Sequence, residues 1–112
     1  DYGAWDGTPL AEVPLEAWRQ WRTDADFRPP GGESLREVGE RTGRLMGDLL
    51  VDDASVIVVT HVSPIKAALT WALGASDLLA WRMFVEVASI SRIGLRQGAP
   101  VMLGFNDTAH LG

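Results

Sequence analysis

The sequence contains no cysteine, which excludes disulfide bonds and thiolate metal sites within it. It also lacks any apolar run long enough to span a membrane. Its ten Lys and Arg residues are scattered among fifteen Asp and Glu, and the net charge is −5. Without a basic stripe, nonspecific binding to nucleic acid or to an anionic membrane is not expected. These absences favour a cytoplasmic protein, and we expect this segment to bind neither membrane nor nucleic acid.

The composition that is present suits a folded domain. Hydrophobic residues make up 46% of the 112 residues and charged residues 22%, which is enough for one core. No internal repeat, low-complexity run or linker divides the chain. Residues 1–112 are therefore assigned to a single domain.

The most informative segment is 55–66, where an apolar β-branched run ends at His61. Four apolar β-branched residues in succession, at 56–59, predict a strand buried on both faces of a parallel sheet, and ligands bind at the carboxyl ends of such strands. Ser63 and Pro64 suit the N-cap and first position of a following helix, whose free N–H groups suit a phosphate. His61 is the first candidate for chemistry, and a hydrogen-bonded core histidine is the alternative.

Two helices are predicted before this strand. Pro14 opens the first, and residues 27–32 then break regular structure as an exposed loop or lid hinge. Ser34 and Glu37 begin the second helix with a capping-box pattern, which an apolar stripe continues.

Several charged residues are assigned to solvated faces. On the second helix, Glu37 with Arg41 and Glu40 with Arg44 are i,i+4 pairs pointing away from the apolar stripe. Lys66 lies in a first helical turn, where a cation opposes the helix dipole, and solvent is the favoured destination of its side chain.

The rest of the chain predicts a core helix and a pair of strands. The helix covers residues 64–73 and stops at Gly74, and Asp77 caps a short helix after it. Strands are predicted over 85–96 and 101–105, joined by a turn at residues 97–100.

The predicted parallel sheet lacks neighbours for its buried strand. No second βα unit precedes residue 55, although parallel strands need such connections. We therefore expect either another chain to complete the sheet or these residues to be the C-terminal part of a larger domain.

Four blocks, in order, resemble the histidine phosphatase superfamily, also called phosphoglycerate-mutase-like. Residues 1–7 resemble the loop after the family's catalytic acid, and residues 32–35 with Arg41 resemble its glycine-glutamate-serine helix start. Residues 58–61 resemble the segment with its second catalytic histidine, and residues 105–111 resemble a frequent C-terminal ending of its phosphatase branch.

The resemblance implies an α/β fold, a three-layer sandwich with a mostly parallel sheet flanked by helices, of which this chain is the C-terminal half. It also implies cofactor-free phosphoryl transfer: a histidine attacks phosphorus, two arginines and a second histidine hold the phosphoryl oxygens, and a carboxylic acid protonates the leaving oxygen. Of that set only the second histidine maps here, onto His61. The Arg-His-Gly nucleophile triplet and the second pocket arginine are absent, and the acid is expected two residues before Asp1. The 112 residues alone are therefore expected to be inactive.

Three further residues are candidates for contact with the substrate. Val62 follows His61 at the helix start, Glu33 precedes the capped helix, and Trp5 is placed to form a wall of the leaving-group pocket. For Glu33 a local structural role is the favoured alternative, and for Trp5 anchoring of its loop. For the other aromatic residues that might line a lid, burial is favoured: Trp18, Trp21 and Phe27.

The other titratable residues give no catalytic or metal pattern. Turn chemistry is sufficient for Asp6, Asp24 and Asp26. His61 and His110 are too far apart in sequence, without cysteine or clustered carboxylates, to indicate a metal site. We expect no metal and no cofactor.

The resemblance implies that the parent protein is a phosphomonoesterase that acts on a small phosphorylated metabolite through a phosphohistidine intermediate. Residues 61–66 are similar to the acid phosphatase domain of actinobacterial bifunctional ribonuclease H/acid phosphatase proteins, and α-ribazole phosphatases are close behind. Two alternatives stay open: a phosphotransferase of the phosphoglycerate mutase type, and a non-catalytic binding or regulatory module with the same fold.

Overall fold

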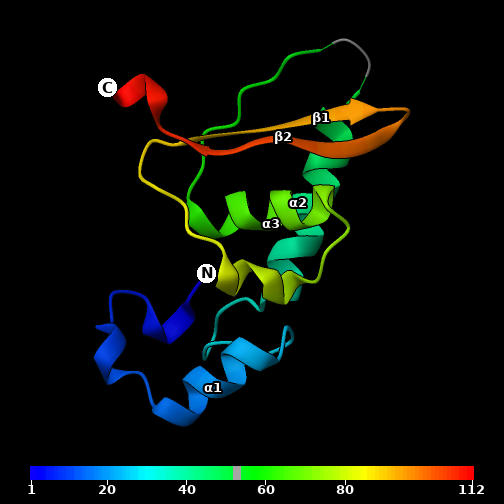
Figure 1. Cartoon of the computed structure of the whole chain (residues 1–112). Coiled ribbons are helices and arrows are strands. Elements are labelled where there is room, and N and C mark those ends of the chain that lie inside the picture. Colours follow the sequence, from blue (N-terminus) through cyan, green and yellow to red (C-terminus); the bar gives the residue numbers. More distant parts are fainter. Residues whose placement is uncertain (52–53) are drawn as a thin grey trace.

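A computed structural model describes residues 1–51 and 54–112 (Figure 1). The α-helices and strands are α1 (Leu15–Thr23), α2 (Leu35–Leu49), α3 (Val62–Ala72), β1 (Ile90–Arg96) and β2 (Ala99–Asp107). Four short 3₁₀ helices accompany them: η1 (Gly3–Trp5), η2 (Leu10–Glu12), η3 (Asp77–Arg82) and η4 (Ala109–Leu111). None of the helices in this described part has the length and apolar character needed to cross a membrane.

The core lies where α2 and α3 pack together. In Figure 1, α3 lies between the two strands and η3, and α1 lies beyond η3 at the opposite end from the sheet. Small residues bring the two helices close, since a Cβ added to Gly43 would lie 2.8 Å from Cδ1 of Trp71. The buried residues of α2 are Val38, Thr42 and Gly43, and those of α3 are Pro64, Ala67, Leu69, Thr70 and Ala72.

The start of α2 confirms the predicted capping box. The Glu37 N–H donates to Ser34 Oγ at 3.1 Å, and the Ser34 N–H donates to Glu37 Oε2 at 2.8 Å. These two bonds satisfy donors that a helix start otherwise leaves free. The predicted opening of α1 after Pro14 is also confirmed.

The segment 27–32 forms no helix or strand, as predicted, and Arg28, Pro30 and Gly31 are exposed, but part of it is anchored to the N-terminal residues. Pro29 is buried, and the Pro30 carbonyl accepts from the Ala4 N–H at 2.7 Å. The Glu33 N–H donates to the Asp1 carbonyl at 2.9 Å. The segment is therefore fixed against the N-terminal residues, a long-range contact that its Pro-Gly composition does not reveal.

Helix α3 begins two residues earlier than predicted. His61 is its N-cap and Val62 its first residue, so Ser63 is not the cap and Pro64 is not the first position. Pro64 is the third residue of α3, in the first turn, where backbone N–H groups have no intrahelical acceptor. The N–H that proline lacks is therefore not needed at this position. The predicted end at Gly74 agrees with its left-handed φ of 61°.

The two strands form an antiparallel hairpin. Gln97 and Gly98 have φ of 52° and 77°, as a two-residue type I′ turn requires. The first strand begins at Ile90 and not at residue 85, because Ala88 has a φ of 58° and the Ser89 N–H bonds back to the Glu86 carbonyl at 3.3 Å.

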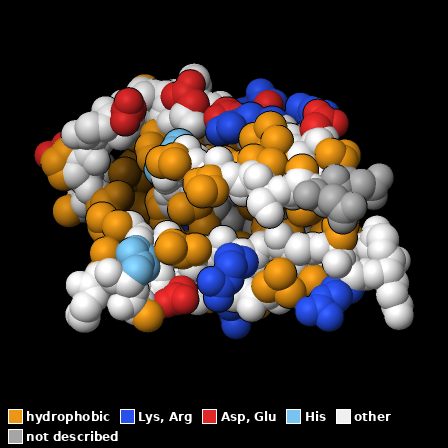
Figure 2. Space-filling view, turned by 90° about the horizontal axis from the view of Figure 1, so that it is seen from above, with side chains coloured by type: hydrophobic (Ala, Val, Ile, Leu, Met, Phe, Trp, Pro, Cys, Tyr) orange, Lys and Arg blue, Asp and Glu red, His pale blue; other side chains and the backbone are white. Residues whose placement is uncertain are grey.

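The predicted buried strand at 55–60 is wrong for this structure. These residues carry no strand pairing, and the side chains of Ile57 and Val59 are 92% and 93% exposed. Figure 2 looks down on this side of the molecule and shows apolar side chains exposed across it. A strand needs hydrogen-bonded neighbours, and the sheet of the described residues contains only β1 and β2. The fold is α/β, but the mostly parallel three-layer sandwich is not confirmed.

Candidate functional site

The site begins at the N-terminus of α3. His61 is the N-cap, with φ −127° and ψ −178°, and its carbonyl accepts from the Ile65 N–H at 3.1 Å. The imidazole makes no capping bond to the helix and is exposed, with Nδ1 3.4 Å from Thr60 Oγ1. The ring is therefore available to a ligand beside the free N–H groups of the first turn, an arrangement that suits an anion.

His61 lines a hollow of about 320 Å³ together with residues of the N-terminal segment and of α2. We call it the polar hollow, defined by Asp1, Glu33, Arg41, His61 and Ser63. These residues are distant in sequence. Backbone hydrogen bonds between residues 1–4 and 30–33 hold the N-terminal segment against the start of α2.

Glu33 and Arg41, which both line this hollow, form a two-point ion pair. Arg41 Nε donates to Glu33 Oε2 at 2.7 Å and Arg41 Nη2 donates to Oε1 at 3.2 Å. The Arg41 guanidinium lowers the pKa of Glu33 below its ordinary 4.5, so the carboxylate is charged at neutral pH. The Glu33 side chain is 26% exposed and the Arg41 side chain 46%, so the guanidinium still has surface for a second anion.

This pairing corrects the prediction that Arg41 belongs to a solvated Glu37–Arg41 pair. Glu37 instead accepts from Arg28 Nη2 at 2.5 Å, and no ion pair joins Glu40 to Arg44 within the described residues. Spacing of i,i+4 along a helix does not decide between partners once another segment supplies a closer one. The resemblance of residues 32–35 with Arg41 grouped this arginine with the block that contains Glu33, but it did not predict the pair.

We expect replacement of Arg41 by glutamine to raise the pKa of Glu33 toward its ordinary value. The guanidinium is the main cause of the depression, and a neutral amide removes its charge. A carbon-13 NMR titration of the glutamate carboxyl groups in the full-length protein measures this. A depressed pKa contributes stability above the unfolded value that is lost as pH falls through the folded value, so the variant should also lose less stability on acidification.

Arg44→Gln is the matched control for this titration. Arg44 is an exposed residue of the same helix, and it makes no ion pair to Glu33. The Glu33 pKa should be unchanged in this variant. An unchanged Glu33 pKa in Arg41→Gln would contradict the assignment of the ion pair.

A second hollow of about 370 Å³ adjoins the first, and apolar surface predominates in the walls of both. We call it the aromatic hollow, defined by Trp5, Trp18, Trp81, Leu10, Val62 and Lys66. The residues that line both hollows are Tyr2, Asp6, Trp21, Leu35 and Ser63. At this junction Tyr2 Oη and Ser63 Oγ share a hydrogen bond of 3.3 Å.

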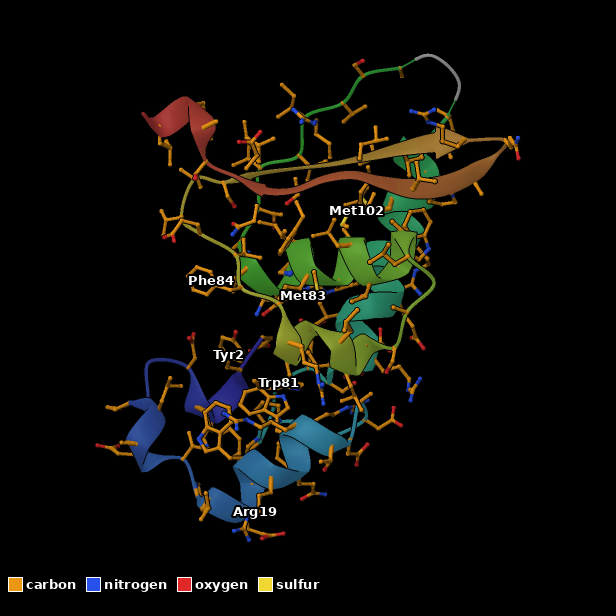
Figure 3. All side chains as sticks on the ribbon, viewed as in Figure 1. Tyr2, Arg19, Trp81, Met83, Phe84 and Met102 are labelled. Carbon is orange, nitrogen blue, oxygen red and sulfur yellow. The ribbon has the colours of Figure 1, made fainter. Side chains whose placement is uncertain are left out.

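The aromatic cluster around Trp21 supports this hollow. Trp21 is 7% exposed, and its ring centre lies 5.3 Å from that of Trp18 and 5.5 Å from that of Trp81. Figure 3 labels Tyr2 and Trp81 in this cluster, between α1 and the elements nearer the sheet. The preferred burial of Trp21 is confirmed. Trp5 both anchors its loop, 5.7 Å from Trp21, and lines the hollow.

Lys66 differs from the prediction of a solvated side chain. It is half-buried at the aromatic hollow, and this burial lowers the pKa of its amino group. Because α3 is apolar almost all round, the aliphatic part of the Lys66 side chain packs against apolar neighbours and only its end can reach solvent.

The structure brings together the four residues singled out from the sequence, in two adjoining hollows. His61 and Glu33 line the polar one, and Val62 and Trp5 line the aromatic one. Their contacts with a substrate stay a prediction. Sequence reasoning missed Tyr2 and Ser63 at the junction, because nothing in their local pattern connects residues 61 positions apart.

The remaining candidates lie in local structure. The Asp24 carboxylate accepts from the Asp26 N–H at 2.9 Å, as turn chemistry predicts, and Asp26 also pairs with Arg36. His110 Nε2 lies 2.9 Å from the Ala88 carbonyl. Within the described residues no three His, Asp or Glu side chains gather as metal ligands.

A histidine, an arginine and a helix start around one hollow can bind a dianionic phosphate ester, and the comparisons with known proteins agree with this chemistry. The family model of the histidine phosphatase superfamily, branch 1, matches residues 1–108. A bifunctional protein of Mycobacterium tuberculosis is 40% identical over 81% of this chain and 26% of its own length. Phosphoserine phosphatase 1 of Hydrogenobacter thermophilus is 31% identical over 100% of this chain and 56% of its own.

Solved structures show the same fold. Phosphoserine phosphatase of Entamoeba histolytica, in complex with 3-phosphoglyceric acid, matches with a TM-score of 0.89 at 21% identity, over 100% of this chain and 59% of that one. A mutant of that enzyme in complex with phosphoserine matches with a TM-score of 0.88. The chain thus spans from about a quarter to three-fifths of the proteins it matches. It belongs to branch 1 of the histidine phosphatase superfamily.

Proposed function

We propose that the protein containing this chain is a phosphomonoesterase that hydrolyses a small phosphorylated metabolite through a phosphohistidine intermediate. The observation that carries the proposal is the polar hollow, where His61 at the start of α3 and the Glu33–Arg41 pair line one space. Family membership supports phosphatase chemistry at such a hollow.

In this proposal His61 and the Val62 N–H donate hydrogen bonds to phosphoryl oxygens. Arg41, oriented by Glu33, adds positive charge at the same hollow. Such donors stabilise the charge that develops on the equatorial oxygens as the phosphoryl group is transferred. The covalent intermediate divides hydrolysis into two displacements at phosphorus, the second of them by water.

The nucleophilic histidine and the carboxylic acid belong, in this proposal, to a segment outside the 112 residues. The absence of an Arg-His-Gly triplet supports this, as does the fraction of the relatives that the chain spans. The same segment, or another chain, is proposed to supply strands beside residues 55–60. The exposed β-branched side chains there, such as Ile57 and Val59, would be covered by it.

Within the phosphatases, we infer the acid phosphatase or α-ribazole phosphatase type. The support is the resemblance of residues 61–66 to those domains.

The fate of the phosphoryl group tests the proposed reaction. The full-length protein is incubated with phosphoserine and with glycerol as a second acceptor, and phosphorus-31 NMR follows the products. We expect inorganic phosphate, and no turnover by the 112-residue chain alone. Transfer to glycerol as the main product would indicate a mutase-type phosphotransferase, and absence of turnover with phosphoserine and with other phosphomonoesters would indicate a non-catalytic module.

A further inference from the structure

We propose that the aromatic hollow receives the leaving group, and that the preferred substrate is a phosphomonoester of an alcohol with a planar, largely apolar body. This inference rests on the proposed function, because it takes the polar hollow as the phosphate site. It adds a chemical class for the alcohol, argued from the walls of the aromatic hollow.

The walls of the aromatic hollow offer flat apolar surfaces on which a planar ring can stack. Trp5, Trp18 and Trp81 line it, and each is half-buried, whereas the cluster's central Trp21 is 7% exposed. The three outer indoles thus keep apolar surface open to the hollow. Its volume of about 370 Å³ lies within the usual size of small-molecule sites, and aromatic rings gain energy by offset stacking or edge contact with such walls.

Two of these indoles are held from outside the hollow. The guanidinium of Arg22, which does not line the hollow, lies 5.4 Å from the ring centre of Trp18 and 6.0 Å from that of Trp81. The indole N–H of Trp81 donates to the Trp21 carbonyl at 3.2 Å. Walls fixed in this way lose little freedom when a ligand enters, which favours binding.

The junction residues place the two hollows within reach of one ester. Tyr2 and Ser63 line both hollows, and Ser63 is two residues after His61. In this inference the ester oxygen of a phosphate beside His61 faces the aromatic hollow. A short polar alcohol such as serine or glycerate would leave the indole faces hydrated. A planar apolar alcohol would displace the water from these faces and bury the apolar surface of the indoles and of the ligand.

A matched pair of esters tests the assignment. The full-length protein is assayed with benzyl phosphate and ethyl phosphate, whose alcohols have similar acidity, so that leaving-group chemistry contributes little to the comparison. We expect kcat/KM for benzyl phosphate to be at least about tenfold higher, since a buried ring adds apolar contact that ethyl lacks. A ratio near one, or a preference for ethyl phosphate, would overturn the inference.

Leu10 and Leu15 offer a variant and its control. Leu10 lines the aromatic hollow and is 71% exposed, so Leu10→Asp puts a charge at the hollow without disturbing the core. Leu15 is 68% exposed and lines neither hollow. Leu10→Asp should reduce the benzyl-to-ethyl ratio by about threefold or more, whereas Leu15→Asp should retain it. An equal effect of both variants would contradict the assignment.

Phosphonates separate this inference from the proposed function, because their binding needs no turnover. Calorimetry compares benzylphosphonate with methylphosphonate on the same full-length protein. Tighter binding of benzylphosphonate by about tenfold, with no hydrolysis of any ester, would leave the pocket assignment standing and refute the phosphatase. Equal binding of the two, with active hydrolysis, would refute the pocket assignment and leave the phosphatase standing.

Discussion

Replacement of His61 by alanine in the full-length protein should lower kcat for phosphomonoester hydrolysis by about 10²- to 10³-fold. The imidazole stands free at the N-cap of α3, in the same hollow as the Glu33–Arg41 pair. Removing one preorganised donor from a developing anion has a cost of this size, because water does not replace it in the same orientation. Phosphate release under saturating substrate measures it.

The second histidine of the chain provides the control. His110 is exposed, lies against the Ala88 carbonyl and lines neither hollow. His110→Ala should keep kcat within about twofold, because surface substitutions away from a site change little. A kcat for His61→Ala within about threefold of the unmodified protein would refute the assigned role. Circular dichroism of both variants shows whether the fold is retained, and the exposure of His61 leads us to expect that it is.

Features set by neighbouring residues were predictable from the sequence. The Ser34–Glu37 capping box and the end of α3 at Gly74 each depend on a few adjacent residues, and each was predicted correctly. The N-cap of α3 was misplaced because Ser63 and Pro64 are good residues for either of two registers. His61 is a candidate for a local reason as well, as the polar residue between an apolar run and a helix, and its role stays a prediction.

Features that depend on distant segments were not predictable in the same way. Arg41 has a suitable local partner in Glu37, yet it pairs with Glu33 because Arg28 engages Glu37. The run at 55–60 has the residues of a buried strand, but burial needs neighbouring strands that the described residues do not supply. The aromatic hollow likewise joins residues from the N-terminal loop, α1 and η3, which no single periodic pattern connects.

Replacement of Trp21 by alanine should lower the free energy of unfolding by about 3–5 kcal/mol. Trp21 is 7% exposed, and its ring contacts those of Tyr2, Trp5, Trp18, Phe27 and Trp81. Alanine would leave a cavity where these rings meet. Each lost aromatic pair adds about 0.5–1.5 kcal/mol to the area term, although the pairs share one ring and are not additive.

Urea denaturation of the full-length protein, followed by circular dichroism, measures this loss, and Leu15→Ala in the same helix is the matched control. Leu15 is 68% exposed, and leucine and alanine both favour helix, so this variant should change stability by less than about 0.5 kcal/mol. A loss below about 1 kcal/mol for Trp21→Ala would show that the cluster does not hold α1 to the rest of the molecule. Since the same ring supports Trp18 and Trp81, the variant should also lose the preference for benzyl phosphate, which links the stability of the cluster to the specificity of the site.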